Sequence, residues 1–193
     1  MSKKYNKGNL KSYGYNEIIH ALLTDPRKSA SEIADELNTY RQKVWREIKK
    51  LEEKKAIWGY TAIINEEKID WKSFIILIKM KPISKKQVDL ELRSLGENKP
   101  KKLNIRLLDF FYINGTYDWI IIFAAENWAA ARKYYDFVRI KYRQFLREKP
   151  ELIEIIFSLV RYGKKNPEIE KLKEFVPPED YEEMEKRLSL IYR

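Results

Sequence analysis

Residues 29–53 read SASEIADELNTYRQKVWREIKKLEE, and this stretch decides the fold of the first part of the chain. Ser29 and Glu32 are spaced as a capping box, in which each side chain satisfies the other residue's exposed backbone N–H at the start of a helix. Asn38 tolerates the left-handed conformation that ends a helix, and Thr39 begins a second capping box for the next helix. Two short helices joined by a tight turn predict a helix-turn-helix.

The second of these helices has two contrasting faces. Val44, Ile48 and Leu51 are spaced by four and three residues and form an apolar stripe. The opposite face is polar, and residues 41–55 hold seven basic and three acidic side chains. We therefore expect this helix to contact DNA through Thr39, Tyr40, Arg41, Gln42, Lys43, Trp45, Arg46, Lys49 and Lys50.

These side chains are suited to different parts of a DNA duplex. Lysines neutralise phosphates and position the protein, as expected for Lys43, Lys49 and Lys50. Guanidinium and amide groups form bidentate bonds to base edges in the major groove, as expected for Arg41, Gln42 and Arg46. Trp45 has three open interpretations: packing on the first helix, which we slightly favour, contact with a thymine methyl, or contact with a sugar. A solvated basic face on a packing helix is the alternative for the whole set.

The overall charge supports a nucleic-acid partner. The 193 residues include 39 Lys and Arg against 29 Asp and Glu, a formal charge of +10. Residues 1–15 hold four lysines and no acid, so we expect a flexible basic arm there. This arm and residues 41–55 together hold eight of the ten excess positive charges. The high share of charged residues, 35%, is typical of proteins from thermophiles.

Several classes of function are excluded by composition. The chain has no cysteine and a single histidine, His20, which we expect to be a partly buried structural residue. Disulfides, thiolate metal sites and cysteine nucleophiles are thus absent, and we expect no cofactor, no metal and no enzyme activity. No apolar run reaches the roughly 18 residues that a membrane span needs, and residues 1–15 lack the apolar core of a secretion signal. We expect a cytoplasmic protein with no membrane contact.

The remainder of the chain alternates between strand and helix patterns. Residues 57–64 are rich in β-branched and aromatic residues and predict a linking strand. Further strands are expected at residues 74–80, 105–113, 119–125 and 153–160, and helices at residues 84–95 and 128–145. The order β-α-β-β-α-β predicts an α+β fold of the ferredoxin-like type. A last helical pattern follows Pro177 and Pro178.

This arrangement resembles the Lrp/AsnC family of transcription regulators of bacteria and archaea. The resemblance covers residues 16–175 and rests on residues 29–34 (SASEIA), on residues 57–60 (IWGY) and on a Gly-x-Tyr-Asp motif at residues 115–118. The family usually has glycine, serine and arginine at positions 38, 40 and 47, where this chain has Asn38, Tyr40 and Glu47.

The resemblance implies a RAM-type effector domain, a homodimer formed through the open face of its sheet, and assembly of dimers into tetramers or octamers. It also implies an amino acid or similar small molecule bound near Gly115, Thr116, Tyr117 and Asp118. The expected domains are the basic arm (1–15), the helix-turn-helix (16–55), the linking strand and hinge (56–70), the effector and dimerisation domain (71–165) and a helical tail (166–193).

Three alternatives are left open. Gly115–Asp118 also fits a plain hairpin turn, with Gly115 at a positive φ and Asp118 capping the turn. Siroheme decarboxylases resemble the same family, but they usually place histidine and arginine in the sheet domain, and this chain has no histidine there. The third alternative is a protein that coats DNA without sequence preference. A helix-turn-helix that contacts only protein is disfavoured by the basic arm and the basic helix.

Overall fold

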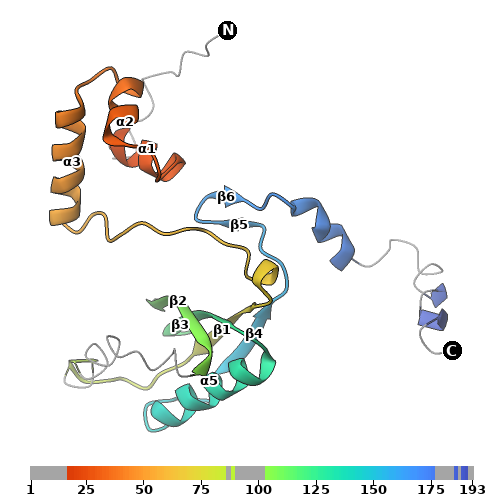
Figure 1. The fold of residues 1–193 in the computed structure, drawn as a ribbon. Coiled ribbons are helices and arrows are strands. Elements are labelled where there is room, and N and C mark those ends of the chain that lie inside the picture. Colours follow the sequence, from red (N-terminus) through yellow and green to blue (C-terminus); the bar gives the residue numbers. More distant parts are fainter. Residues whose placement is uncertain (1–16, 86–87, 90–102, 177–184, 187, 191–193) are drawn as a thin grey trace. The chain divides into compact units, whose positions relative to one another are not determined.

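The computed structural model describes residues 17–85, 88, 89, 103–176, 185, 186 and 188–190 (Figure 1). The chain divides into two compact units, Met1–Ala62 and Ile63–Arg193. The expected basic arm, most of the helix expected at residues 84–95 and most of the terminal helix lie outside the described residues. None of the helices in the described ranges is both long and apolar enough to span a membrane.

The first unit is a three-helix cluster. Its helices are α1 (Glu17–Thr24), α2 (Ala30–Glu36) and α3 (Arg41–Glu53). Apolar side chains from all three form its core, namely Ile18, Ala21, Ile33, Ala34 and Val44. His20 is exposed, because α1 turns Ile18 and Ala21 inward; the expectation of a partly buried histidine is therefore wrong.

Of the two capping boxes predicted around the turn, one forms and the other does not. The box at the start of α2 is confirmed: the backbone N–H of Ser29 donates to Glu32 Oε2 at 2.7 Å, and that of Glu32 donates to Ser29 Oγ at 3.2 Å. Asn38 is left-handed, with φ of 50°, as predicted. The second box is wrong, because the N-cap of α3 is Tyr40 and no side chain caps that helix. The backbone N–H of Thr39 donates to the Ala34 carbonyl at 2.9 Å, which keeps Thr39 in the turn that closes α2.

The linking segment, residues 57–64, forms no strand within one chain. No backbone hydrogen bond joins residues 58–63 to any other residue that the structure describes. A strand needs a neighbouring strand, so the predicted strand is not observed in the single chain. The segment leads into the short 3₁₀ helix η2 (Glu66–Ile69), which Asn65 caps and which ends at the left-handed Asp70.

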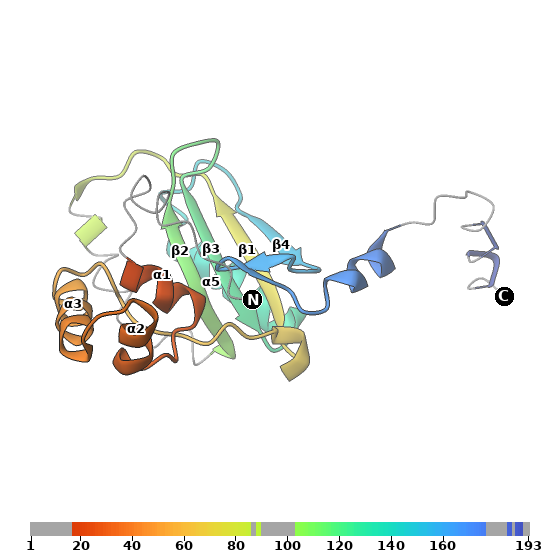
Figure 2. The same cartoon turned by 90° about the horizontal axis from the view of Figure 1, so that it is seen from above.

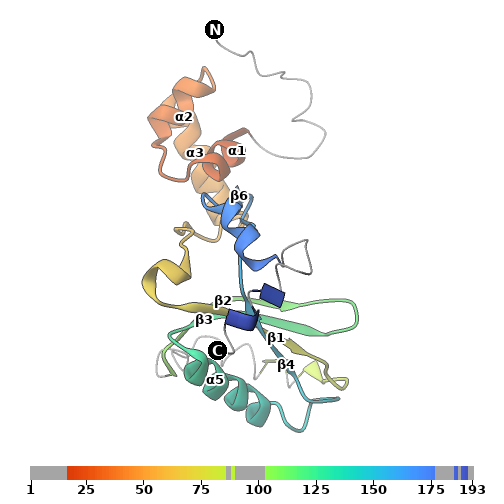
Figure 3. The same cartoon turned by 90° about the vertical axis from the view of Figure 1, so that its right-hand side faces the viewer.

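The second unit is built on a four-stranded antiparallel sheet. Its strands are β1 (Lys72–Ile78), β2 (Ile105–Tyr112), β3 (Trp119–Ala125) and β4 (Glu151–Ile155), and its helix is α5 (Trp128–Lys141). The strand order is β2-β3-β1-β4 (Figure 2), which confirms the predicted ferredoxin-like α+β fold. Phe74, Ile76 and Ile78 alternate along β1 and are fully buried beneath α5, which lies along one face of the sheet (Figure 3).

The chain after β4 departs from the expected single strand. β4 ends at Ile155, and β5 (Val160–Arg161) and β6 (Lys164–Lys165) form a separate hairpin, here called the C-terminal hairpin. Tyr162 and Gly163 turn it with φ values of 47° and 76°. The hairpin lies on the side of the sheet away from α5 (Figures 1 and 3). The 3₁₀ helix η4 (Ile169–Phe175) follows.

Candidate nucleic-acid interface

Helix α3 turns most of its polar side chains to solvent. Val44 is fully buried, Ile48 packs against the core of the first unit, and Glu47, Leu51 and Glu52 are half-buried, while every other position of the helix is exposed. Eight of the nine residues expected to contact DNA are exposed, and Thr39 is half-buried. The helix and the two residues before it therefore leave nearly all of the side chains expected to contact DNA accessible.

The basic groups of α3 differ in their charge partners. Within the described part of the chain, Arg41, Lys43 and Arg46 pair with no carboxylate, so the first half of the helix has uncompensated positive charge. Arg46 Nε donates to the Gln42 carbonyl at 3.3 Å. This bond uses one guanidinium nitrogen and leaves the two terminal nitrogens for other acceptors.

The second half of α3 is compensated by its own acids. Lys49 Nζ lies 3.0 Å from Glu52 Oε2, and Lys50 Nζ lies 3.7 Å from Glu47 Oε2. The hydrogen bond between Lys49 and Glu52 lowers the pKa of Glu52 and raises the pKa of Lys49. Both pairs are solvent-exposed, so each contributes little to stability. Their main effect is to reduce the positive charge of this half of the helix.

A hydrogen bond ties the linking segment to α3. Tyr60 donates its hydroxyl to Glu52 Oε1 at 3.3 Å, so Glu52 accepts bonds from both Tyr60 and Lys49. Burial raises the pKa of Tyr60, and the nearby charge of Glu52 raises it further. The hydroxyl is therefore neutral at physiological pH and acts as a donor.

Exposed aromatic rings occur in α3 and in the residues on either side of it. Trp45 is 54% exposed, so much of its surface is accessible to DNA, and all three interpretations of this residue stay predictions. Tyr40, at the start of α3, is also exposed. Trp58, in the linking segment, is 94% exposed. Sequence reasoning missed Trp58 because it assigned the residue to a strand.

Tyr117 and Asp118 of the Gly-x-Tyr-Asp motif form hydrogen bonds that hold the β2–β3 loop against the sheet. Asp118 Oδ2 accepts a hydrogen bond from the Met80 backbone N–H at 2.6 Å, and the Asp118 N–H donates to the Ile78 carbonyl at 2.9 Å. Tyr117 donates its hydroxyl to Glu151 Oε1 at 2.6 Å, a bond that raises the pKa of Tyr117. Both side chains thus connect the β2–β3 loop to β1 and β4.

The remaining two residues of the motif are exposed. Gly115 does not have a positive φ, so the conformational role expected for it is wrong. The loop between β2 and β3 spans residues 113–118 and reverses the chain over more residues than a two-residue turn, which makes the left-handed conformation unnecessary. Gly115 and Thr116 are the two motif residues left accessible to a ligand.

Comparisons with known proteins agree with this geometry. A family of winged helix-turn-helix DNA-binding domains matches residues 16–57. An HTH-type transcriptional regulator of Pyrococcus abyssi is 33% identical over 111 residues, which cover 58% of this chain and 70% of that protein. The name of this relative describes a transcriptional regulator, so it gives no support to the siroheme-decarboxylase alternative.

Solved structures share the fold of the chain. The AsnC family transcriptional regulator from Agrobacterium tumefaciens superposes with a TM-score of 0.59 at 16% identity, covering 78% of this chain and 93% of that one. The transcriptional regulator NMB0573 from Neisseria meningitidis, solved as a complex with L-Met, superposes with a TM-score of 0.56 at 12% identity, covering 75% and 89%. At these identities the structures establish a common fold.

Proposed function

We propose that this chain, which belongs to the Lrp/AsnC family of helix-turn-helix transcriptional regulators, reads a specific double-stranded DNA sequence with the first half of α3. One observation carries the proposal: Arg41, Lys43 and Arg46 are exposed and lack acid partners among the described residues. The N-terminal part of a recognition helix is the part that normally contacts base edges.

Each side chain has a defined part in this proposal. Arg41, Gln42 and Arg46 bond base edges in the major groove, and lysines contact phosphates. Lys43 is available for a phosphate at once, whereas Lys49 and Lys50 must exchange Glu52 and Glu47 for phosphate oxygens. Tyr40 and Trp45 contact sugars or thymine methyl groups at the edge of the helix.

We also propose a homodimer, whose dimers can assemble further into tetramers or octamers. The face of the sheet opposite α5 carries aliphatic side chains that are only partly buried in one chain, including Ile75, Ile122 and Ile153. An uncovered apolar sheet face is energetically unfavourable in water. The unpaired backbone of the linking segment supplies a second surface, since an exposed strand edge favours pairing with another chain.

The experiment that tests this function is selection of bound DNA from a random duplex pool at stated salt concentrations. A two-fold dimer predicts a palindromic consensus with half-sites about one helical turn apart, or a multiple of it. Recovery of no consensus, together with a steep salt dependence, would instead establish the sequence-independent coating of DNA.

A second proposal concerns an effector at the β2–β3 loop. We propose that Gly115 and Thr116 contact an amino acid, while Tyr117 and Asp118 hold the loop in place. The complex of the Neisseria regulator with L-Met supports an amino acid as the ligand class. Thermal-shift measurements with the twenty amino acids at millimolar concentration test this, and the absence of any shift would reject it.

A further inference from the structure

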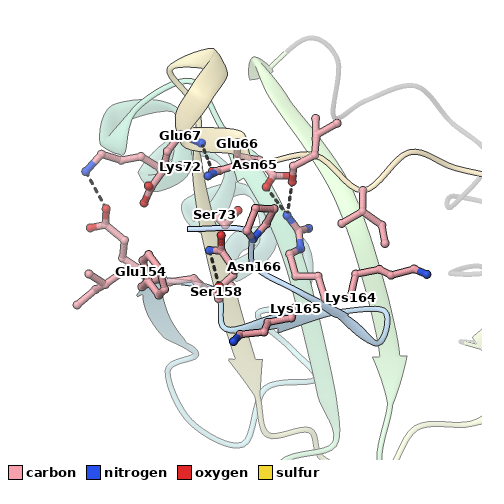
Figure 4. Close-up of a pocket in the computed structure, with 17 residues that line it drawn as sticks. Asn65, Glu66, Glu67, Lys72, Ser73, Glu154, Ser158, Lys164, Lys165 and Asn166 are labelled. Atoms are coloured by element: carbon pink, nitrogen blue, oxygen red, sulfur yellow. Dashed lines mark hydrogen bonds and ion pairs between the residues drawn. The ribbon is translucent and has the colours of Figure 1, made fainter. Parts of the chain in front are cut away.

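A cavity of about 530 Å³ opens at the start of β1, within the second unit (Figure 4). Four pieces of chain form its walls: the end of the linking segment with η2, the first residues of β1, the end of β4, and the C-terminal hairpin with the residues that follow it. This volume lies in the range of about 300–1,000 Å³ that is typical of small-molecule sites. The effector loop binds the other end of β1, about 20 Å away along the strand.

Polar contacts hold the walls of the cavity together. Arg161 of β5 donates to the Ile64 carbonyl at 2.9 Å and also bonds to Glu66, which Arg106 of β2 contacts at 2.7 Å. Asn166 donates its amide to the Ser158 carbonyl at 2.8 Å (Figure 4). The cavity is therefore formed before any ligand arrives, which reduces the ordering cost of binding.

Two of the three acids that line the cavity are neutralised by other groups, and the third, Glu67, is exposed and has no ion pair with another described residue. Glu66 is paired with Arg106 and Arg161. Glu154 accepts hydrogen bonds from Lys72 Nζ and from the indole N–H of Trp128, both at 2.7 Å. The bond from Lys72 keeps the pKa of Glu154 below its ordinary value. These two carboxylates consequently have little capacity left to bind a cation.

The cations that line the cavity have donors to spare. Arg161 uses one of its three guanidinium nitrogens for contacts with other described residues, and its side chain is 24% exposed. Lys165, on β6, forms no ion pair with any residue in the ranges that the structure describes. Guanidinium and ammonium groups with open donors are suited to a carboxylate.

The rest of the wall is apolar. It includes Ile63, Ile155, Ile156, Phe157 and Pro167. Ile156 is 61% exposed, and Ile63 is also exposed, so a ligand would remove apolar surface of this wall from water. A ligand that satisfies both parts of the site has one negative charge and a branched or aromatic body.

We propose that this cavity binds a small organic monocarboxylate with an apolar body, the carboxylate lying against Arg161 and Lys165 and the body against the isoleucine wall. The inference does not rest on the DNA contact or on the effector loop, because it uses other residues. Since residues 63–67 form one wall, the bound molecule also fixes the point at which the linking segment enters the second unit.

The test uses 3-phenylpropionate as the probe and 3-phenylpropionamide as its uncharged match, both measured by isothermal titration calorimetry on the full chain. We expect the carboxylate to bind at least tenfold more tightly than the amide. Lys165→Gln should weaken the carboxylate about tenfold, the effect of losing one charge-assisted hydrogen bond. Ile156→Trp should abolish binding of both compounds by filling the cavity.

A control variant separates the site from general effects. Lys173→Gln changes an exposed lysine of η4 that does not line the cavity, and this variant should bind the probe as the unmodified chain does. Circular dichroism spectra and melting temperatures verify that each variant is folded. Equal binding of acid and amide, unchanged binding in Ile156→Trp, or no binding at 10 mM probe would each overturn the proposal.

Discussion

Glu66 is the buried charge on which the geometry of the second unit depends, and Glu66→Gln tests this directly. The carboxylate is 3% exposed, and it joins η2 to β2 through Arg106 and to β5 through Arg161. Glutamine has the same shape but only one acceptor oxygen. One arginine keeps an acceptor, and the other faces an amide that donates hydrogen bonds.

The size of the effect can be bounded from the exposure of the two arginines. Removing one partner of a fully buried ion pair costs about 3–5 kcal/mol. The side chains of Arg106 and Arg161 are 43% and 24% exposed, so water solvates the group that loses its partner. We therefore expect the loss of one charge-assisted hydrogen bond, about 2 kcal/mol of unfolding free energy.

Urea denaturation followed by tryptophan fluorescence measures this loss. Trp45 and Trp58 are changed to phenylalanine in every variant, so that the signal comes from the remaining tryptophans, which all lie in the second unit. Glu67→Gln is the control, because Glu67 is exposed and forms no ion pair with another described residue; it should change stability by less than about 0.5 kcal/mol. A loss below about 0.5 kcal/mol for Glu66→Gln would refute the argument.

Substitutions at Arg46, Phe74 and Glu154 test three of the contacts described above. Arg46→Ala should weaken binding to the selected DNA sequence by about 1–3 kcal/mol in a fluorescence-anisotropy titration, because the proposed base contact is lost. Phe74→Ala should cost about 3–5 kcal/mol in urea denaturation, since Phe74 is fully buried beside Phe123. The pKa of Glu154 is lowered by Lys72 from an ordinary 4.5, so its stabilising effect is present above pH 4.5 and is lost as the pH falls through the folded-state pKa. The difference in melting temperature between the unmodified chain and Glu154→Gln should accordingly shrink below pH 4.5.

Each of these predictions has a matched control. Arg132→Ala removes an exposed arginine of α5 and should leave DNA affinity unchanged. Ile140→Ala truncates a mostly exposed side chain of the same helix and should cost under about 1 kcal/mol. Equal DNA affinity for Arg46→Ala and Arg132→Ala would contradict the base contact. A melting-temperature difference for Glu154→Gln that does not vary with pH would contradict the ion-pair argument.

The sequence predicted those features that depend on near neighbours. The Ser29–Glu32 box needs residues three apart, and the alternation of Phe74, Ile76 and Ile78 needs only the strand period of two. The capping box and the strand alternation could therefore both be predicted from short stretches of the sequence. The same holds for the exposed basic face of α3, which follows from the helical period.

Features that depend on distant partners were not predictable in this way. Glu66 pairs with residues 40 and 95 positions away, so nothing local marked it as buried. The cavity was missed for the same reason, since its walls come from separate parts of the chain. Thr39 was misassigned because its backbone bond to Ala34 competes with capping, and that competition is decided by the geometry of the turn.

The unbonded backbone of residues 58–63 has a consequence for binding two half-sites. Six extended residues reach at most about 20 Å, so whether free or paired with the partner's segment they limit how far a DNA-binding unit can lie from its own sheet. In the proposed dimer, docking of the first recognition helix would hold the second at an effective concentration in the millimolar range. Weak contacts by each helix would then add to tight binding at two correctly spaced half-sites. The length of this segment would set which spacings are accepted.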